Sequence, residues 1–150
     1  MRAADLVFVN GAVHTMAESL TTAEAVAVTG SRITAVGTER EIRALAGKGT
    51  TIVDLVGGAV LPGINDSHLH AAMLGAYWPH SWLDTMASGN GLPTPRTLAT
   101  DGDRRAALRR AWDFLLALGV TSYTEPGLGP GARGQHGGSC DEDMLRVYTA

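Results

Sequence analysis

The chain has 150 residues, of which 45% are hydrophobic and 18% charged, and its formal net charge is −3. This length allows one or two small domains with a real core, and the mild negative charge argues against a nucleic-acid partner. No apolar run approaches the length that crosses a membrane, and residues 1–5 do not open a signal peptide. The single cysteine, Cys140, excludes an internal disulfide and is compatible with a reducing cytoplasm, where we predict the protein to be.

The first 58 residues are expected to form a small, mostly antiparallel β unit. Residues 6–9 are apolar β-formers, and Asn10-Gly11 is the dipeptide typical of a tight two-residue turn. Residues 12–16 are therefore predicted to return as the second strand of a hairpin. His14 lies on this strand and receives no ligand role, because the other histidines are far from it in the chain.

A second hairpin and one further strand are expected in the same unit, at residues 25–37 and 51–56. Between them, Thr38 is expected to cap a short helix over residues 39–46. Glu41 stands three residues after Thr38, which is the spacing of a capping box.

The most informative stretch is residues 60–70, which reads Val-Leu-Pro-Gly-Ile-Asn-Asp-Ser-His-Leu-His. Alternate side chains of an extended segment point to one side, so Asp66, His68 and His70 are expected to face one point. Two imidazoles aimed at one point can share a metal ion, and a nearby carboxylate can bind the ion or orient a ligand. From the spacing alone, a solvated His-x-His loop remains the alternative.

Aromatic residues gather soon after the histidines. Residues 71–78 can be helical, and Pro79 is expected to end that helix. Tyr77, Trp78 and Trp82 either wall a substrate pocket beside the metal or pack a loop against the fold. His80 lies among them, and we disfavour it as an additional metal ligand.

Residues 84–103 read as a long exposed loop, and residues 103–118 give the clearest helix in the sequence. Asp101 or Asp103 is expected to cap its start. The arginines are placed largely on the opposite, solvated face. One apolar face is predicted from helical spacing, and it consists of Leu108, Ala111, Trp112, Leu115 and Leu118.

The segment after this helix, residues 119–127, predicts a strand that runs parallel to the one before His68. Glu125 lies near the carboxyl end of this strand. It can serve as a metal ligand, a supporting carboxylate or a substrate contact, or it can simply belong to the turn before Pro126. Residues 128–138 form a glycine-rich loop without the signature of a phosphate loop.

Ser139 is expected to cap a final helix over residues 141–148. Cys140 stands at the start of this helix, where the pKa of its thiol can be depressed. It has no visible partner in the sequence, so we interpret it as an ordinary small residue rather than a metal ligand.

Residues 60–70 closely resemble the first barrel strand of the amidohydrolase superfamily, with its Pro-Gly-(apolar)-x-Asp-x-His-x-His signature. The Asn-Asp-Ser-His-Leu-His form is most like the amidohydrolase 3 (YtcJ-like) branch, and residues 119–127 resemble the second barrel strand. The resemblance implies an α/β fold in two parts. Residues 1–58 would be half of a composite β-sandwich, and residues 59–150 would be the first two βα units of an incomplete (β/α)8, TIM-like barrel.

The resemblance also implies a metal-dependent amidohydrolase, in which a metal-activated water hydrolyses a C–N bond of an amide or N-acyl substrate. His68 and His70 would bind Zn²⁺ or another divalent ion, Asp66 would support them, and Glu125 is the candidate catalytic residue. The family takes further histidines and a proton-accepting aspartate from later strands, which are missing here. We therefore expect an N-terminal fragment, a truncated frame or half of a split enzyme, that is inactive alone.

Two alternatives remain open at this point. The chain can be a non-catalytic αβ module that pairs with a complementing C-terminal chain, or with itself, through an open sheet edge. It can also belong to the deaminase branch of the same superfamily, since later loops set the substrate.

Overall fold

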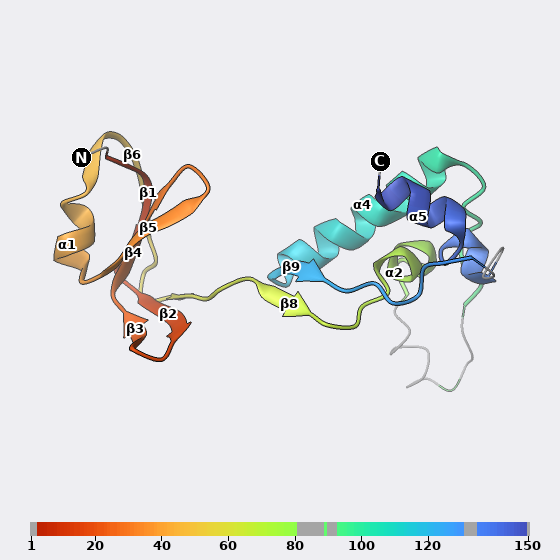
Figure 1. The fold of residues 1–150 in the computed structure, drawn as a ribbon, viewed down its shortest axis with the longest axis horizontal. Helices are drawn as coiled ribbons and strands as arrows, with labels where there is room; N and C mark the ends of the chain where they lie inside the picture. Colours follow the sequence, from red (N-terminus) through yellow and green to blue (C-terminus); the bar gives the residue numbers. More distant parts are fainter. Residues whose placement is uncertain (1–2, 81–88, 90–92, 131–134, 150) are drawn as a thin grey trace. The chain divides into compact units, whose positions relative to one another are not determined.

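The computed structural model describes residues 3–80, 89, 93–130 and 135–149. The chain forms two compact units, Met1–Pro62 and Gly63–Ala150, which are red to yellow and yellow-green to blue in Figure 1. In the described part of the chain, we find no helix of the length and apolarity that a bilayer crossing demands.

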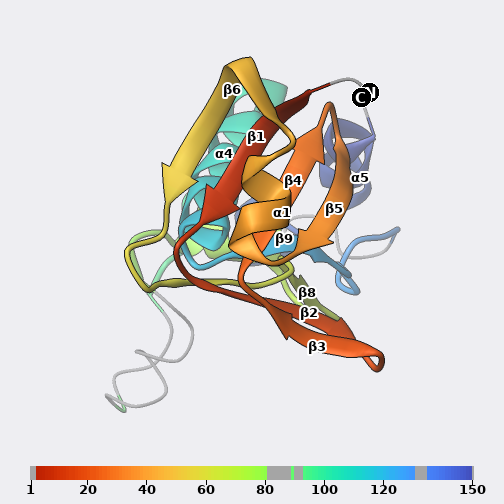
Figure 2. The ribbon, with the colours of Figure 1, turned by 90° about the vertical axis from the view of Figure 1, so that its left-hand side faces the viewer.

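A four-stranded sheet, in the order β5-β4-β1-β6, is the larger of the two sheets in the first unit (Figure 2). Strand β1 pairs antiparallel with β4 and parallel with β6. Small and branched side chains suit its buried face, where Val7, Val9, Ala25 and Ala27 pack with Ile42. The strands are β1 (Ala4–Val9), β4 (Ala25–Thr29), β5 (Arg32–Gly37) and β6 (Ala46–Asp54).

A second, three-stranded sheet has the order β3-β2-β7. Its strands are β2 (Ala12–Ala17), β3 (Leu20–Ala23) and β7 (Ala59–Val60). The prediction of a hairpin between residues 6–9 and 12–16 is therefore wrong, because β1 and β2 belong to different sheets. A tight type I′ turn needs positive φ at both central residues, and of this pair only Asn10 has it, at 57°.

Asn10-Gly11 instead carries the chain from one sheet to the other. The side-chain amide of Asn10 donates to Asp54 Oδ1 at 2.7 Å, which ties the turn to the end of β6. A side chain at Gly11 would collide with the carbonyl oxygen of Gly58. Glycine at position 11 allows two backbone segments to approach closely. An Asn-Gly pair in the sequence does not show whether its glycine has this role or belongs to a tight turn.

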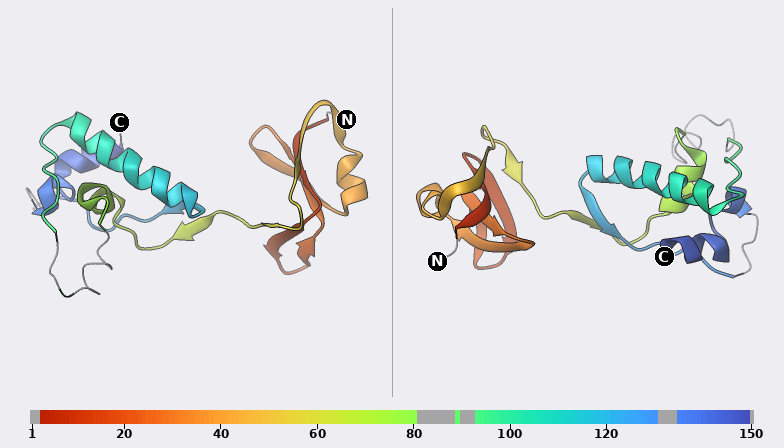
Figure 3. Two further views of the ribbon diagram at one scale, coloured as in Figure 1. Left: turned by 180° about the vertical axis from the view of Figure 1, so that it is seen from behind. Right: turned by 90° about the horizontal axis from the view of Figure 1, so that it is seen from above.

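The second predicted hairpin is confirmed, with β4 and β5 antiparallel on either side of Gly30. The capping box of Thr38 and Glu41 is also confirmed, but helix α1 (Glu39–Arg43) is shorter than predicted. Residues 44 and 45 form a turn after the helix, and Ala46 begins β6, where it pairs with Ala4 of β1. At Ala46, sheet pairing thus overrides the local helical preference. Figure 3 shows α1 beside the strands of the larger sheet.

The second unit contains a two-stranded parallel sheet, β8 (Ile64–Asp66) and β9 (Val120–Tyr123), as predicted. Its helices are α2 (Ala71–Tyr77), α4 (Asp101–Ala117) and α5 (Glu142–Tyr148), with a 3-10 turn η1 (Gln135–Gly138). Helix α4 contacts α2, α5 and β9 (Figure 1). Helix α2 ends before Pro79, as predicted.

Small residues let α2 and α4 approach closely. A side chain at Gly75 would collide with the backbone carbonyl of Ala107 on α4. The core beside this contact includes three alanines, and Leu108 and Met144 are its largest fully buried members. The packing of α2 on α4 therefore leaves little room for larger side chains at this crossing.

The structure corrects both predicted helix caps in this unit. Thr100, and not Asp101 or Asp103, caps α4; Asp103 completes the capping box instead. Asp141, and not Ser139, caps α5, since its carboxylate accepts from the backbone N–H of Met144. In both cases a neighbouring polar residue is also a good capping residue, so composition alone does not choose between them.

The predicted faces of α4 are only partly correct. Leu108, Ala111 and Leu115 are buried, but Trp112 and Leu118 are 37% and 57% exposed. Arg104, expected on the solvated face, is 6% exposed. Its guanidinium lies 3.5 Å from Asp143 and 3.8 Å from Asp141, so carboxylates near the start of α5 make its burial possible.

Candidate metal centre and cavity

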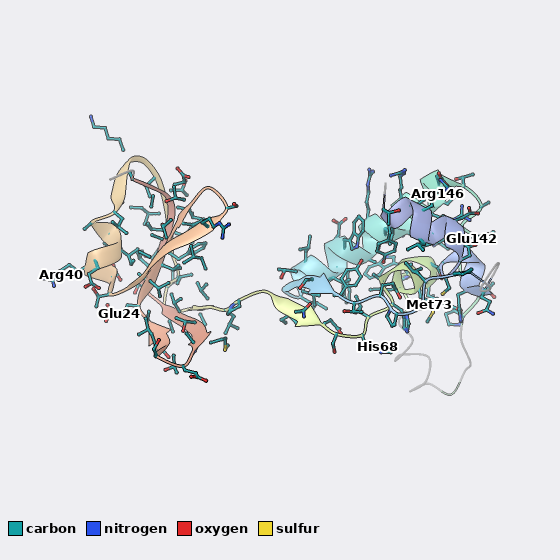
Figure 4. All side chains as sticks on the ribbon, viewed as in Figure 1. Glu24, Arg40, His68, Met73, Glu142 and Arg146 are labelled. Carbon is teal, nitrogen blue, oxygen red and sulfur yellow. The ribbon has the colours of Figure 1, made fainter. Side chains whose placement is uncertain are left out.

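His68 and His70 follow β8, which ends at Asp66, so neither histidine lies on the strand itself. Their rings nevertheless meet edge to face, with centroids 5.2 Å apart and an interplanar angle of 89°. His68 is exposed and His70, which directly precedes α2, is partly buried. The two imidazoles are thus neighbours just after the end of β8, but the alternation of side chains along a strand does not explain this, because neither histidine lies on the strand. Figure 4 shows His68 on the segment between β8 and α2.

The side chain of Asp66 makes a hydrogen bond to the backbone just after β8. Its Oδ1 accepts a hydrogen bond from the backbone N–H of His68 at 3.0 Å. A carboxylate that holds the next turn in this way fixes the direction in which His68 leaves the strand. Asp66 also borders the cavity described below. The observed contact of Asp66 is thus with the backbone of His68, and its support of a metal ion stays a prediction.

Glu125, just beyond the end of β9, contacts His70. The distance from His70 Nδ1 to Glu125 Oε1 is 2.9 Å, and the glutamate side chain is only 9% exposed. The same oxygen accepts from the backbone N–H of Gly127 at 3.1 Å. A Cβ at Gly127 would lie 2.7 Å from His70 Nδ1, so glycine makes the pairing possible.

This pairing decides what His70 can bind. A carboxylate accepts hydrogen bonds, so it favours the tautomer with hydrogen on Nδ1 and leaves the Nε2 lone pair free. Metal-ligating histidines are commonly oriented by a carboxylate in this way. The other oxygen, Glu125 Oε2, is buried without a hydrogen-bond partner. Sequence spacing could not pair two residues 55 positions apart, although both were singled out individually.

A cavity of about 840 Å³ opens beside the two imidazoles. Four of the five histidines in the chain line it, and the fifth, His14, lies on β2 in the first unit. Apolar side chains supply much of the remaining wall. Those lining residues are Leu69, Met73, Leu74, Phe114, Leu115, Leu118 and Val120. Such a cavity suits a ligand with an apolar body and a few polar atoms.

The three aromatic residues considered as a possible wall of a substrate pocket have different positions. Tyr77 lines the cavity. Trp78 is not among the lining residues and packs on Phe114, with ring centroids 5.2 Å apart. Trp82 lies outside the described residues, as do parts of the predicted loop over residues 84–103 and of the glycine-rich loop.

His80 and Cys140 also line the cavity. Burial raises the pKa of the Cys140 thiol, which is opposite to the depressed pKa that a helix start can produce. His136 lines it too, and the sequence reasoning missed this residue because it treated the glycine-rich loop as one unit. The available signal was a histidine placed directly before two glycines.

The residues fit a divalent cation only in part. His68 and His70 provide suitable nitrogen donors, and Glu125 has both an orienting oxygen and an unpartnered one. Zinc takes at least three protein ligands in most sites. Within residues 3–80, 89, 93–130 and 135–149, no group of three or more histidine, cysteine or acidic side chains is placed to hold an ion. A complete zinc site would need further ligand atoms from outside these residues.

Several known proteins are similar to this chain. An N-substituted formamide deformylase from Arthrobacter pascens is 39% identical over 77 residues, and an imidazolonepropionase from Rubrobacter xylanophilus is 38% identical over 110 residues. The matches cover 51% and 65% of this chain but only 14% and 26% of those proteins. The chain therefore spans well under two thirds of the length of the curated relatives that it matches. No family model matches the sequence.

The fold is also found in a solved structure, an uncharacterized metal-dependent hydrolase from Pyrococcus furiosus. The match covers 96% of this chain and 46% of that one, with a TM-score of 0.67 and 17% identity. The chain thus has the mixed α/β fold of metal-dependent hydrolases. This match concerns the fold alone, and the support for the amidohydrolase superfamily that residues 60–70 resemble comes from the curated relatives.

Proposed function

We propose that the chain is the N-terminal portion of a metal-dependent amidohydrolase of the amidohydrolase 3 (YtcJ-like) branch, acting on a C–N bond of an amide or N-acyl compound. One observation carries the proposal: two adjacent imidazoles, of which one is held by a buried carboxylate, border a large cavity. The sequence relatives support it, since one of them is an N-substituted formamide deformylase. The single cysteine supports a cytoplasmic location.

Each residue has a defined task in this proposal. Glu125 holds the hydrogen on His70 Nδ1, so that Nε2 of His70 and the ring of His68 are donors to one Zn²⁺ or similar ion. Asp66 fixes the turn that carries His68. When bound, such an ion lowers the pKa of water and polarises a carbonyl group. The apolar wall of the cavity holds the substrate's apolar part and excludes water from it.

We further propose that the chain alone has little activity. Among the described residues, no group of three or more histidine, cysteine or acidic side chains is placed to hold an ion, and Glu125, the carboxylate beside the two imidazoles, is already engaged with His70. Hydrolysis needs a group that removes a proton from the attacking water, in reach of the reacting atoms. The remaining ligands and this acceptor would belong to a C-terminal portion of the enzyme.

The test combines metal binding with turnover. Zinc affinity is measured by competition with a chromophoric chelator for the wild type, for His68→Ala/His70→Ala and for His14→Ala. We expect saturable binding of one ion, which is lost in the double variant and unchanged in His14→Ala. Formate release from N-benzylformamide should stay at the buffer rate. Equal zinc affinity in all three proteins would contradict the metal site, and turnover that depends on His68 and His70 would contradict the inactivity.

A non-catalytic role remains the second candidate, because one observation favours it. The parallel sheet of the second unit has only two strands among the described residues. Ile64 on β8 and Leu118, which ends α4 before β9, are 54% and 57% exposed. Such a sheet can pair with a complementing chain or a second copy. Sedimentation of the purified chain distinguishes the cases: a monomer that hydrolyses an amide excludes this candidate. Ammonia release from amino-substituted heterocycles would instead indicate a deaminase.

A further inference from the structure

A second polar pair lies in the cavity, apart from His68 and His70. The hydroxyl of Tyr77, the last residue of α2, is 2.9 Å from Nδ1 of His136 in η1, and both residues line the cavity. The two rings are tilted by 56°, with centroids 6.0 Å apart, so the contact is a hydrogen bond rather than a stack.

The backbone holds His136 in an uncommon conformation. Its φ and ψ are 47° and 42°, in the left-handed region that non-glycine residues seldom adopt. The carbonyl of His136 accepts from Ser139 Oγ at 2.9 Å, and Ser139 is fully buried. Outliers of this kind persist only where the surroundings fix them, and they occur often at ligand sites.

Residues 96–98 connect the backbone next to His136 with helix α2, which carries Tyr77. The backbone N–H of Arg96 donates to the carbonyl of Ala76 on α2, and that of Leu98 donates to the carbonyl of Gly137. A side chain at Gly137 would collide with the carbonyl of Arg96, so glycine is required for this approach. The position of His136 relative to Tyr77 is therefore set by backbone contacts on both sides.

The hydrogen bond defines what His136 offers to a ligand. Burial raises the pKa of Tyr77, which keeps its hydroxyl protonated. A phenol is a good donor, and a neutral imidazole nitrogen accepts from it. With Nδ1 as the acceptor, the ring hydrogen sits on Nε2, which then acts as a hydrogen-bond donor.

We propose that His136, positioned by Tyr77, is a ligand-binding residue that donates from Nε2 to a carbonyl oxygen of a compound with an apolar substituent. The apolar wall formed by residues such as Leu74, Phe114 and Leu118 holds that substituent. The inference rests on the proposed function only in the choice of carbonyl compounds as ligands, and it does not depend on a metal ion.

The experiment uses N-benzylformamide as the probe and EDTA in all samples, so that failure of the proposed metal site leaves the result unaffected. Calorimetry gives the Kd of the probe, and ¹⁵N NMR of the imidazoles gives the tautomer of His136 and its response to the probe. We expect saturable binding, hydrogen on Nε2 of His136 before the probe is added, and a shift of that resonance on binding.

Three variants complete the test. His136→Phe keeps a ring but removes the donor and should raise the Kd about tenfold, while His136→Gln, which restores a side-chain N–H, should recover part of the affinity. His14→Phe changes a histidine on β2 that does not line the cavity, and it should alter the Kd less than twofold. Tyr77→Phe should release the tautomer of His136. Absent binding, hydrogen on Nδ1 of His136 in the wild type, or an unshifted His136 resonance would each overturn the proposal, whether or not every variant folds.

Discussion

The two units of the chain differ in how completely their polar groups are paired. In the first unit, the turn at Asn10 and the helix cap at Thr38 both have hydrogen-bond partners close by. In the second, three buried side-chain atoms among the described residues have no hydrogen-bond partner. These atoms are Arg104 Nε, Arg110 Nε and Glu125 Oε2. Unpaired buried polar atoms are costly, so native proteins keep few of them without a reason.

The difference indicates where the chemistry of the chain is concentrated. The cavity, the paired imidazoles and the unpartnered oxygen of Glu125 all belong to the second unit. The first unit contains only His14 among the five histidines. Departures from local consistency tend to mark functional sites, and one of the three unpartnered atoms, Glu125 Oε2, belongs to a residue that the sequence singled out.

The largest expected effect comes from Gly75→Ala, which places a methyl group against the carbonyl of Ala107. Because α2 and α4 must then separate, the free energy of unfolding of the second unit should fall by about 3 kcal/mol. Hydrogen exchange of the amides of each unit measures this separately. Gly49→Ala is the matched control, since nothing lies within 4 Å of a Cβ there. Unchanged protection of α2 and α4 in Gly75→Ala would show that their packing is looser than described.

Glu125→Gln should weaken zinc binding at least tenfold, or about 1.4 kcal/mol, because the neutral amide holds the hydrogen on His70 Nδ1 less firmly. The exposed Glu18→Gln in the first unit is the control for loss of one negative charge. Chelator competition measures both. Equal losses in the two variants would mean that net charge, and not the contact with His70, sets the affinity.

The two capping boxes allow a direct comparison of the units. Thr38→Ala and Thr100→Ala each remove an oxygen that accepts from a backbone N–H at the start of a helix. Each should cost about 1 kcal/mol, the first in the first unit only and the second in the second unit only. Thr→Ser at either position keeps the oxygen and should cost much less. A loss of hydrogen-exchange protection in both units from one substitution would refute their independence.

The smallest effect is expected in acid. Hydrogen bonds from Arg146 lower the pKa of Asp101 from its ordinary value of 3.8. A carboxyl group with a lowered folded-state pKa stabilises the fold above its ordinary pKa, and this contribution is lost as pH falls through the folded-state pKa. The stability difference between wild type and Asp101→Asn should thus be present near pH 6 and shrink below pH 3.8. Denaturant titrations at several pH values measure it, and a difference that grows in acid would contradict the assignment.

Much of the secondary structure could be predicted because its causes are local. The Thr38 capping box and the turn at Gly30 follow from residue types at short spacing. The parallel order of β8 and β9 follows from the helix that connects them. The Asn10-Gly11 hairpin failed because the same dipeptide also suits a crossing between sheets.

The site could be predicted only as separate residues. His68, His70 and Glu125 were each singled out, but the contact between His70 and Glu125 depends on how β8 and β9 align. The burial of Arg104 and the place of His136 depend on long-range packing of α5 and of residues 96–98. No periodicity in the sequence reports such contacts, because they join elements far apart in the chain.

The central claim is that His68 and His70 bind one metal ion, with Glu125 directing Nε2 of His70 toward it. A zinc titration followed by ¹⁵N NMR of the imidazole nitrogens tests this most directly. We predict that His68 and His70 shift together up to one equivalent, that His70 keeps its hydrogen on Nδ1, and that His14 does not respond. Independent shifts of the two histidines, or hydrogen on Nε2 of His70 at saturation, would contradict it.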